Sequence, residues 1–90
     1  MDIELYDKEK KRLYSILHLL ARIEKEVIKS GQELTKLGII KSPIDDVVME
    51  CRRKIVDADY AVCCLRDKMD NAVFDEWLAE LDKSLTEKGE

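Results

Sequence analysis

The stretch Leu34–Asp46, which reads LTKLGIIKSPIDD, decides the fold because it holds a helix stop followed closely by a helix start. Gly38 can adopt the left-handed backbone conformation at little steric cost, as the residue after a helix often does. Ile39 would then fold back onto Leu34, which is the apolar contact typical of a Schellman stop. The first half of the stretch therefore predicts a helix that ends near Leu37.

The second half of the stretch predicts a new helix that begins at Pro43. Ser42 would supply the N-cap oxygen, and proline suits the first helical position because the N–H that it lacks would have no partner there. Asp45 and Asp46 favour the positive end of the helix dipole. A stop and a start this close indicate two antiparallel neighbouring helices joined by a turn over residues 38–42.

The first predicted helix spans about residues 2–37 and carries a coiled-coil-like heptad pattern. One apolar row recurs every seven residues, and a second row falls three residues after members of the first. Gly31 interrupts the pattern at a cost of about 1 kcal/mol relative to alanine, so any kink or break is expected at Ser30–Gly31. The first row is Tyr6, Leu13, Leu20, Val27 and Leu34, and the second is Ile16, Ile23 and Leu37.

The second predicted helix spans about residues 43–69 and also carries two apolar rows. After Met69 the apolar positions shift in phase, which is typical either of a stutter in one helix or of a break into two. The helix therefore continues, or restarts after a cap at Asp70–Asn71, to about residue 86, and residues 87–90 are expected to fray. The two rows are Val48, Ile55, Val62 and Met69, and Cys51, Ala58, Leu65 and Ala72.

The composition supports one all-α domain over residues 1–90. Charged residues make up 40% of the chain and aromatic residues 6%, with three glycines and one proline, which suits helices better than sheets. An apolar content of 46% is too high for a disordered chain. The expected fold is a long antiparallel helical hairpin.

Apolar side chains outside the two seams are too numerous for a hairpin alone. Burying one leucine or isoleucine contributes about 1.5–3 kcal/mol, so we expect these side chains to be covered. A third helix formed by the C-terminal segment would cover them in a three-helix bundle. A second copy would cover them in a dimeric four-helix bundle, and a different protein is the remaining choice. We favour the homodimer.

Net charge and cysteine content indicate in which compartment the protein works and which classes of partner it binds. The formal net charge is −4, whereas proteins that bind nucleic acid through phosphates are usually basic. No apolar run approaches the roughly 20 residues of a membrane span, and the acidic start of the chain is unlike a signal peptide. Three cysteines, an odd number, suit a reducing compartment. We expect a cytoplasmic protein that binds neither a membrane nor, as its main partner, nucleic acid.

The sequence favours neither phosphotransfer through a histidine nor zinc binding by the cysteines. His18, the only histidine, would lie on the outer side of the first helix, as in a phosphotransfer module, but the Leu-Leu-Ala-Arg that follows lacks the glycine usual there. Cys63 and Cys64 are adjacent, and Cys51 lies about 18 Å along the helix axis at 1.5 Å per residue. Structural zinc sites prefer paired, spaced cysteines. We therefore expect no metal, no cofactor and no enzymatic activity, and keep phosphotransfer as a second alternative.

Two basic clusters provide the first alternative function, a regulator that binds nucleic acid. One cluster lies near the start of the first helix and the other near the start of the second. In the hairpin each comes close to acidic residues, so a solvated face with ion pairs is the simpler interpretation. The residues that would contact nucleic acid are Lys8, Lys11, Arg12, Arg52 and Arg53.

The preferred function is protein docking by a small non-enzymatic adaptor, regulator or inhibitor. The region after Asp70 is acidic and carries two large aromatic residues, a combination common on helices that dock on proteins. Surplus apolar residues in the two helices would extend this docking surface. The candidate docking residues are Leu17, Val56, Tyr60, Phe74, Trp77 and Leu81.

Overall fold

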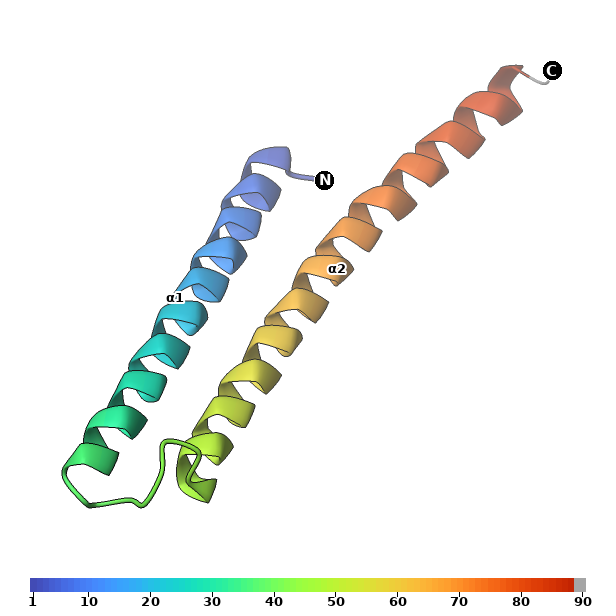
Figure 1. Ribbon diagram of the computed structural model, residues 1–90. Helices are drawn as coiled ribbons and strands as arrows, with labels where there is room; N and C mark the ends of the chain where they lie inside the picture. The colour runs from blue at the N-terminus through green and yellow to red at the C-terminus, as the bar shows by residue number, and fades with distance from the viewer. Residues whose placement is uncertain (89–90) are drawn as a thin grey trace.

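A computed structural model describes residues 1–88 of the protein, with side chains described to Thr86. Two long helices, α1 (Ile3–Lys36) and α2 (Asp46–Lys88), lie side by side and antiparallel (Figure 1). No strand is present among the described residues. The all-helical hairpin predicted from the sequence is confirmed.

The end of α1 is the Schellman stop that the sequence predicts. Gly38 has a φ of 75°, in the left-handed region. Its N–H donates to the carbonyl oxygen of Thr35 at 3.1 Å, and the N–H of Ile39 donates to that of Leu34 at 3.0 Å. These two hydrogen bonds define the motif and satisfy carbonyl groups that the last helical turn would otherwise leave unpaired.

The start of α2 differs from the prediction by three residues. Ser42 and Pro43 form a β-turn, closed by a 3.1 Å hydrogen bond from the N–H of Asp45 to the carbonyl oxygen of Ser42. Serine at the first position of such a turn and proline at the second are both favoured. The helix cap is Asp45, whose carboxylate accepts the N–H of Val47 at 3.0 Å. Ser42 was thus wrongly predicted as the cap, because its residue type suits a turn and a cap equally well.

Helix α2 is continuous from Asp46 to Lys88. The sequence left open whether this helix continues past Met69 or restarts at Asp70–Asn71. The structure shows that it continues, so residues 70–86 do not fold back as a third helix. The helix extends past residue 86, so residues 87 and 88, expected to fray, are helical. The rest of that expectation, residues 89–90, lies outside the described residues.

The seam between the helices contains the first predicted row of each helix but not the second. The rows that begin at Tyr6 and at Val48 are partly or fully buried throughout. Residues predicted for the second rows are largely outside the seam: Ile23, Leu37, Cys51, Leu65 and Ala72 are exposed. Partly or fully buried in their place are the positions four residues after the first rows, namely Lys10, Leu17, Glu24 and Gly31 in α1 and Arg52, Asp59, Arg66 and Val73 in α2.

The side of each helix that faces the other is therefore rotated relative to the prediction, and Gly31 explains part of this difference. It is buried, and a Cβ atom there would lie 3.2 Å from Cγ1 of Val48 and 3.4 Å from the carbonyl oxygen of Pro43. The glycine therefore lets α1 approach α2 and the loop closely. The kink expected at Ser30–Gly31 does not break the helix, which runs unbroken to Lys36.

The hairpin has almost no enclosed core. Its radius of gyration is 21.5 Å, whereas a globular chain of this length has one of about 12 Å. Its accessible surface is 7432 Å², against about 5,400 Å² for a globular protein of its mass. Among the described side chains, Val48 is the one hydrophobic residue that is buried, at 8% exposure. Two helices side by side bury only a strip of each.

Helix α2 extends beyond the start of α1 (Figure 1). The amino group of Met1 pairs with Glu76 at 2.7 Å, which places the beginning of α1 level with that residue. Residues 77–86, which we call the C-terminal arm, therefore project past α1, and all of them are exposed.

Candidate docking surface

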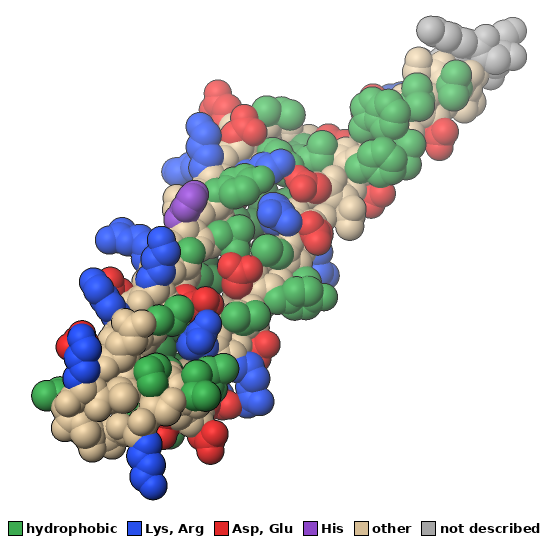
Figure 2. All heavy atoms as spheres, viewed as in Figure 1, with side chains coloured by type: hydrophobic (Ala, Val, Ile, Leu, Met, Phe, Trp, Pro, Cys, Tyr) green, Lys and Arg blue, Asp and Glu red, His purple; other side chains and the backbone are tan. Residues whose placement is uncertain are grey.

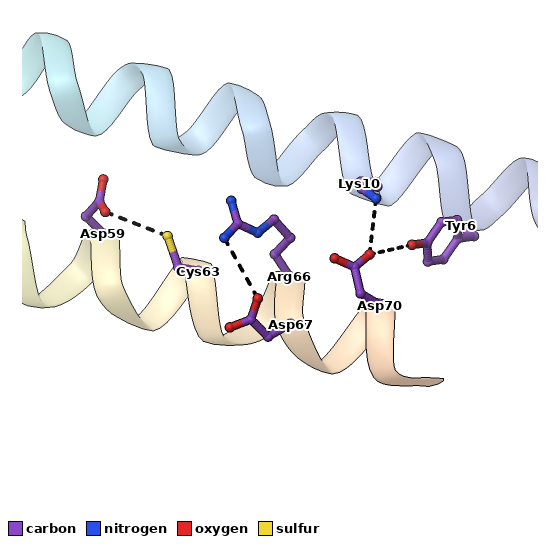
Figure 3. Close-up of polar contacts among 7 residues, drawn as sticks. All are labelled: Tyr6, Lys10, Asp59, Cys63, Arg66, Asp67 and Asp70. Atoms are coloured by element: carbon purple, nitrogen blue, oxygen red, sulfur yellow. Dashed lines mark hydrogen bonds and ion pairs between the residues drawn. The ribbon is translucent and has the colours of Figure 1, made fainter. Parts of the chain in front are cut away.

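Toward the open end of the hairpin, a polar cluster joins the two helices (Figure 3). The hydroxyl of Tyr6 donates to Oδ1 of Asp70 at 2.8 Å, and Nζ of Lys10 donates to the same oxygen at 3.1 Å. The Tyr6 hydroxyl and then Lys10 lower the pKa of the Asp70 carboxyl by stabilising its charged form. The hydrogen bond to Asp70 raises the pKa of Tyr6 and that of Lys10. The cluster therefore adds polar contacts between α1 and α2 to the partly buried apolar residues of the seam, such as Leu13 and Met69.

The remaining polar contacts in Figure 3 lie within α2. Sγ of Cys63 contacts Oδ1 of Asp59 at 3.8 Å, and Arg66 pairs with its neighbour Asp67 at 3.8 Å. The three cysteines are free. Within residues 1–88, no three histidine, cysteine or acidic residues are grouped so that they could hold a metal ion.

His18 lies on the exposed outer side of α1, as the sequence predicts (Figure 2). Within the described part of the chain, no hydrogen bond or ion pair of its side chain is present. The structure therefore brings no second chemical group to this histidine.

The two basic clusters lie apart and are largely paired with glutamates. Arg12 pairs with Glu9 at 3.4 Å, Arg52 with Glu24 at 3.9 Å, and Arg53 with Glu50. Arg53, ahead of the charge of Lys54, lowers the pKa of Glu50. Lys8 and Lys11 are exposed. Lys10 meets Asp70 whereas Arg52 meets Glu24, so the clusters lie about 20 Å apart along the helices at 1.5 Å per residue.

Five of the six candidate docking residues lie on one side of α2. At 100° per residue they and Met49 fall within a sector of about 100°, whose centre lies roughly a quarter turn from the centre of the seam and whose edge nearest the seam is Trp77. All are exposed, from 40% for Leu81 to 71% for Tyr60. Leu17 differs, because it is partly buried in the seam of α1. We define the outer stripe of α2 as Met49, Val56, Tyr60, Phe74, Trp77 and Leu81.

The outer stripe ends in an aromatic pair. The rings of Phe74 and Trp77 stack with their centroids 5.8 Å apart, and both side chains are more than half exposed. Figure 2 shows hydrophobic groups along the hairpin and a further cluster on the projecting end of α2. Acidic residues border this end, with Asp75 and Asp82 about two turns apart on one edge of the stripe.

Two grooves flank the seam near the loop, on opposite faces of the hairpin. The first, of about 650 Å³, is lined by residues that precede seam positions, including Leu19, Ile23, Val47 and Cys51. The second, of about 630 Å³, is lined by residues that follow them, including Met49, Arg53 and Val56. The second groove therefore adjoins the outer stripe. Sequence reasoning missed the first groove because it assigned Ile23 and Cys51 to the seam.

Comparison of the chain with known proteins finds no relative, because no family model, curated protein or solved structure matches it. Over the described residues, neither helix combines the length and the apolar character needed to cross a membrane.

Proposed function

We propose that the protein is a non-enzymatic helical docking module, an adaptor, regulator or inhibitor that acts by packing a helix face against another chain. The observation that carries this proposal is the near absence of a core. Among the described side chains one hydrophobic residue is buried, whereas Leu19, Ile23, Tyr60 and Trp77 are about half exposed or more. Exposed apolar surface of this extent is typical of interaction sites.

The accessible area favours a second copy as the partner. The hairpin exposes about 2,000 Å² more than a globular protein of its mass. A standard interface buries about 800 Å² on each partner, and obligate homodimers bury more. Packing two hairpins together would cover an area of this size and produce a dimeric four-helix bundle. The docking surface would then be the outer stripe of α2 with the groove beside it.

The concentration dependence of unfolding tests this proposal. The full chain is unfolded thermally, followed by circular dichroism, over a hundredfold range of protein concentration. A midpoint that rises with concentration supports completion by a second copy, because association stabilises the folded state by mass action. A helical chain without a cooperative transition at any concentration would instead point to a different protein as the completing partner. A cooperative transition that is independent of concentration would contradict the docking proposal.

A further inference from the structure

We propose that two copies pair through the outer stripes of α2 in antiparallel register. The C-terminal arm of each copy then covers the second groove of the other, the one that adjoins the outer stripe. This inference rests on the proposed function and specifies its geometry. The partner is a second copy of this chain, and the surface on each copy is completed only by the arm of the other.

The spacing along α2 supports a helix–helix interface separate from the hairpin seam. Exposed apolar positions recur at coiled-coil spacings, because Val56 follows Met49 by seven residues and Tyr60 follows Val56 by four, and steps of three and four lead from Phe74 through Trp77 to Leu81. Because α2 is one continuous helix, both groups lie on the same side of it. α1 cannot cover this side, since it packs about a quarter turn from the centre of the stripe and its beginning lies level with Glu76, before Trp77.

The stripe is apolar at both ends and polar in the middle, where Asp67 and Asp70 lie. Two arrangements place apolar ends on apolar ends. A parallel pair sets each end against its own copy, and an antiparallel pair sets the arm of one copy against the loop end of the other. Charge decides between them.

In a parallel pair the two acidic arms would lie together. Residues 75–82, which include the start of the arm, carry Asp75, Glu76, Glu80 and Asp82, and the first basic residue after them is Lys83. Like charges placed opposite one another are destabilising. An antiparallel pair separates the arms and brings each one to residues 49–56, which carry Arg52, Arg53 and Lys54 against the single acid Glu50. The side chain of Arg53 is 69% exposed there, so it can reach a partner.

The antiparallel register follows from matching the two halves of the stripe. With a two-fold axis near Leu65, Met49 lies opposite Leu81 of the other copy, and Val56 lies opposite Phe74. The register also sets residues 49–56 of each copy level with residues 74–81 of the other, so the basic side chains of the first segment lie alongside the acidic side chains of the second. One rotation satisfies both pairs twice, as expected of an isologous dimer. It also stacks the two α1 helices, which completes four helices.

Engineered disulfides test the register in the full-length chain. With Cys51, Cys63 and Cys64 replaced by alanine, Met49→Cys and Leu81→Cys chains are prepared separately, oxidised alone, and oxidised as a mixture. The antiparallel register predicts a cross-linked dimer in the mixture, with the Met49→Cys chain alone remaining largely uncross-linked. Cross-linking of Met49→Cys with itself would overturn the antiparallel register while leaving self-association intact. Sedimentation of the same samples as monomers would overturn both the register and the homodimer.

Trp77, the only tryptophan, gives a second readout that needs no cysteine replacement. On dilution of the wild-type chain, its emission is expected to shift to longer wavelength and its quenching by acrylamide to increase as the dimer dissociates. Trp77→Asp is expected to weaken the dimer by at least about 30-fold, the size of a tryptophan hot spot. Ala79→Asp, which adds the same charge on the far side of the arm, is the matched control. Equal weakening by both, or a Trp77 signal unchanged across a dimer–monomer transition, would overturn the proposal.

Discussion

The two ends of α2 are built from similar residues and have opposite surroundings. At the loop end Val48 is 8% exposed and packs against Gly31, and the adjoining loop has a cap, a turn and a Schellman stop. At the other end Trp77, at 56% exposure, lies on a helix that has passed the last contact with α1. Local chemistry therefore closes the hairpin, whereas nothing within the described chain covers the arm.

The contrast between the two ends indicates which residues stabilise the monomer. Backbone hydrogen bonds and one close approach specify the loop end, so single substitutions there should change the free energy of unfolding of the hairpin itself. Arm residues lack such contacts, so their substitutions should act mainly on association.

The largest effect on the hairpin is expected from Gly31→Leu. A side chain there must displace Val48 and the carbonyl group of Pro43, and overpacking of this kind costs about 1–3 kcal/mol. Urea unfolding measures the loss. Gln32→Leu, at an exposed neighbouring position, is the control and should change stability by less than about 0.5 kcal/mol. Equal effects at both positions would show that the close approach at Gly31 is unimportant.

A smaller loss, of about 1–2 kcal/mol, is expected from Gly38→Ala. No atom lies within 4 Å of the position of the added Cβ, so the whole cost comes from the left-handed backbone conformation. Gly38→Asn should lose less, because asparagine tolerates this conformation better. The free energy of unfolding of both variants is measured in urea. A loss with asparagine as large as that with alanine would argue against the conformational explanation.

Asp45→Ala is expected to destabilise the protein by about 1 kcal/mol, since it removes the carboxylate that caps α2. Ser42→Ala leaves the backbone turn hydrogen bond in place and should cost less. Thermal unfolding of the two variants compares the observed cap with the cap predicted from the sequence. A larger loss for Ser42→Ala would restore serine as the cap.

The smallest effect concerns pH and the cluster at the open end. The pKa of Asp70 is lowered below its ordinary value of 3.8, so the unfolded chain binds more protons there. The stabilisation by Asp70 is thus fully present above that value and is lost as the pH falls through the lowered pKa. Urea unfolding from pH 6 to pH 2.5 should show Asp70→Asn less stable than wild type at the higher pH and converging with it in acid. A constant difference would contradict this role.

Sequence periodicity predicted correctly the first row of seam residues on each helix and predicted the second row incorrectly. Positions three and four residues after a seam residue lie on either side of it, and Cys51 and Leu65 were assigned to the seam because they are apolar, whereas Arg52 and Arg66 lie there. The choice between them depends on contacts across the hairpin, such as the Glu24–Arg52 ion pair and the fit of Gly31 against Val48. Such contacts leave no signal in the period of one helix.

The candidate docking residues were predictable to the extent that they depend on local pattern. Val56, Tyr60, Phe74, Trp77 and Leu81 stand outside the heptad rows, and all are exposed. Leu17 was grouped with them because α1 was expected to face α2 with a different side. The proposed register of the dimer depends on α2 being continuous through Asp70. The sequence did not decide this, because no glycine or proline near Asp70 indicates a break.

Sedimentation equilibrium of the wild-type chain measures directly whether a second copy covers the apolar surface of the hairpin. The chain has a mass of 10.5 kDa. We predict a mass twice that value at micromolar concentration, and a return to the single-chain mass on dilution or with Trp77→Asp. A single-chain mass for the wild type at high micromolar concentration, with the helices folded, would contradict the proposed dimer.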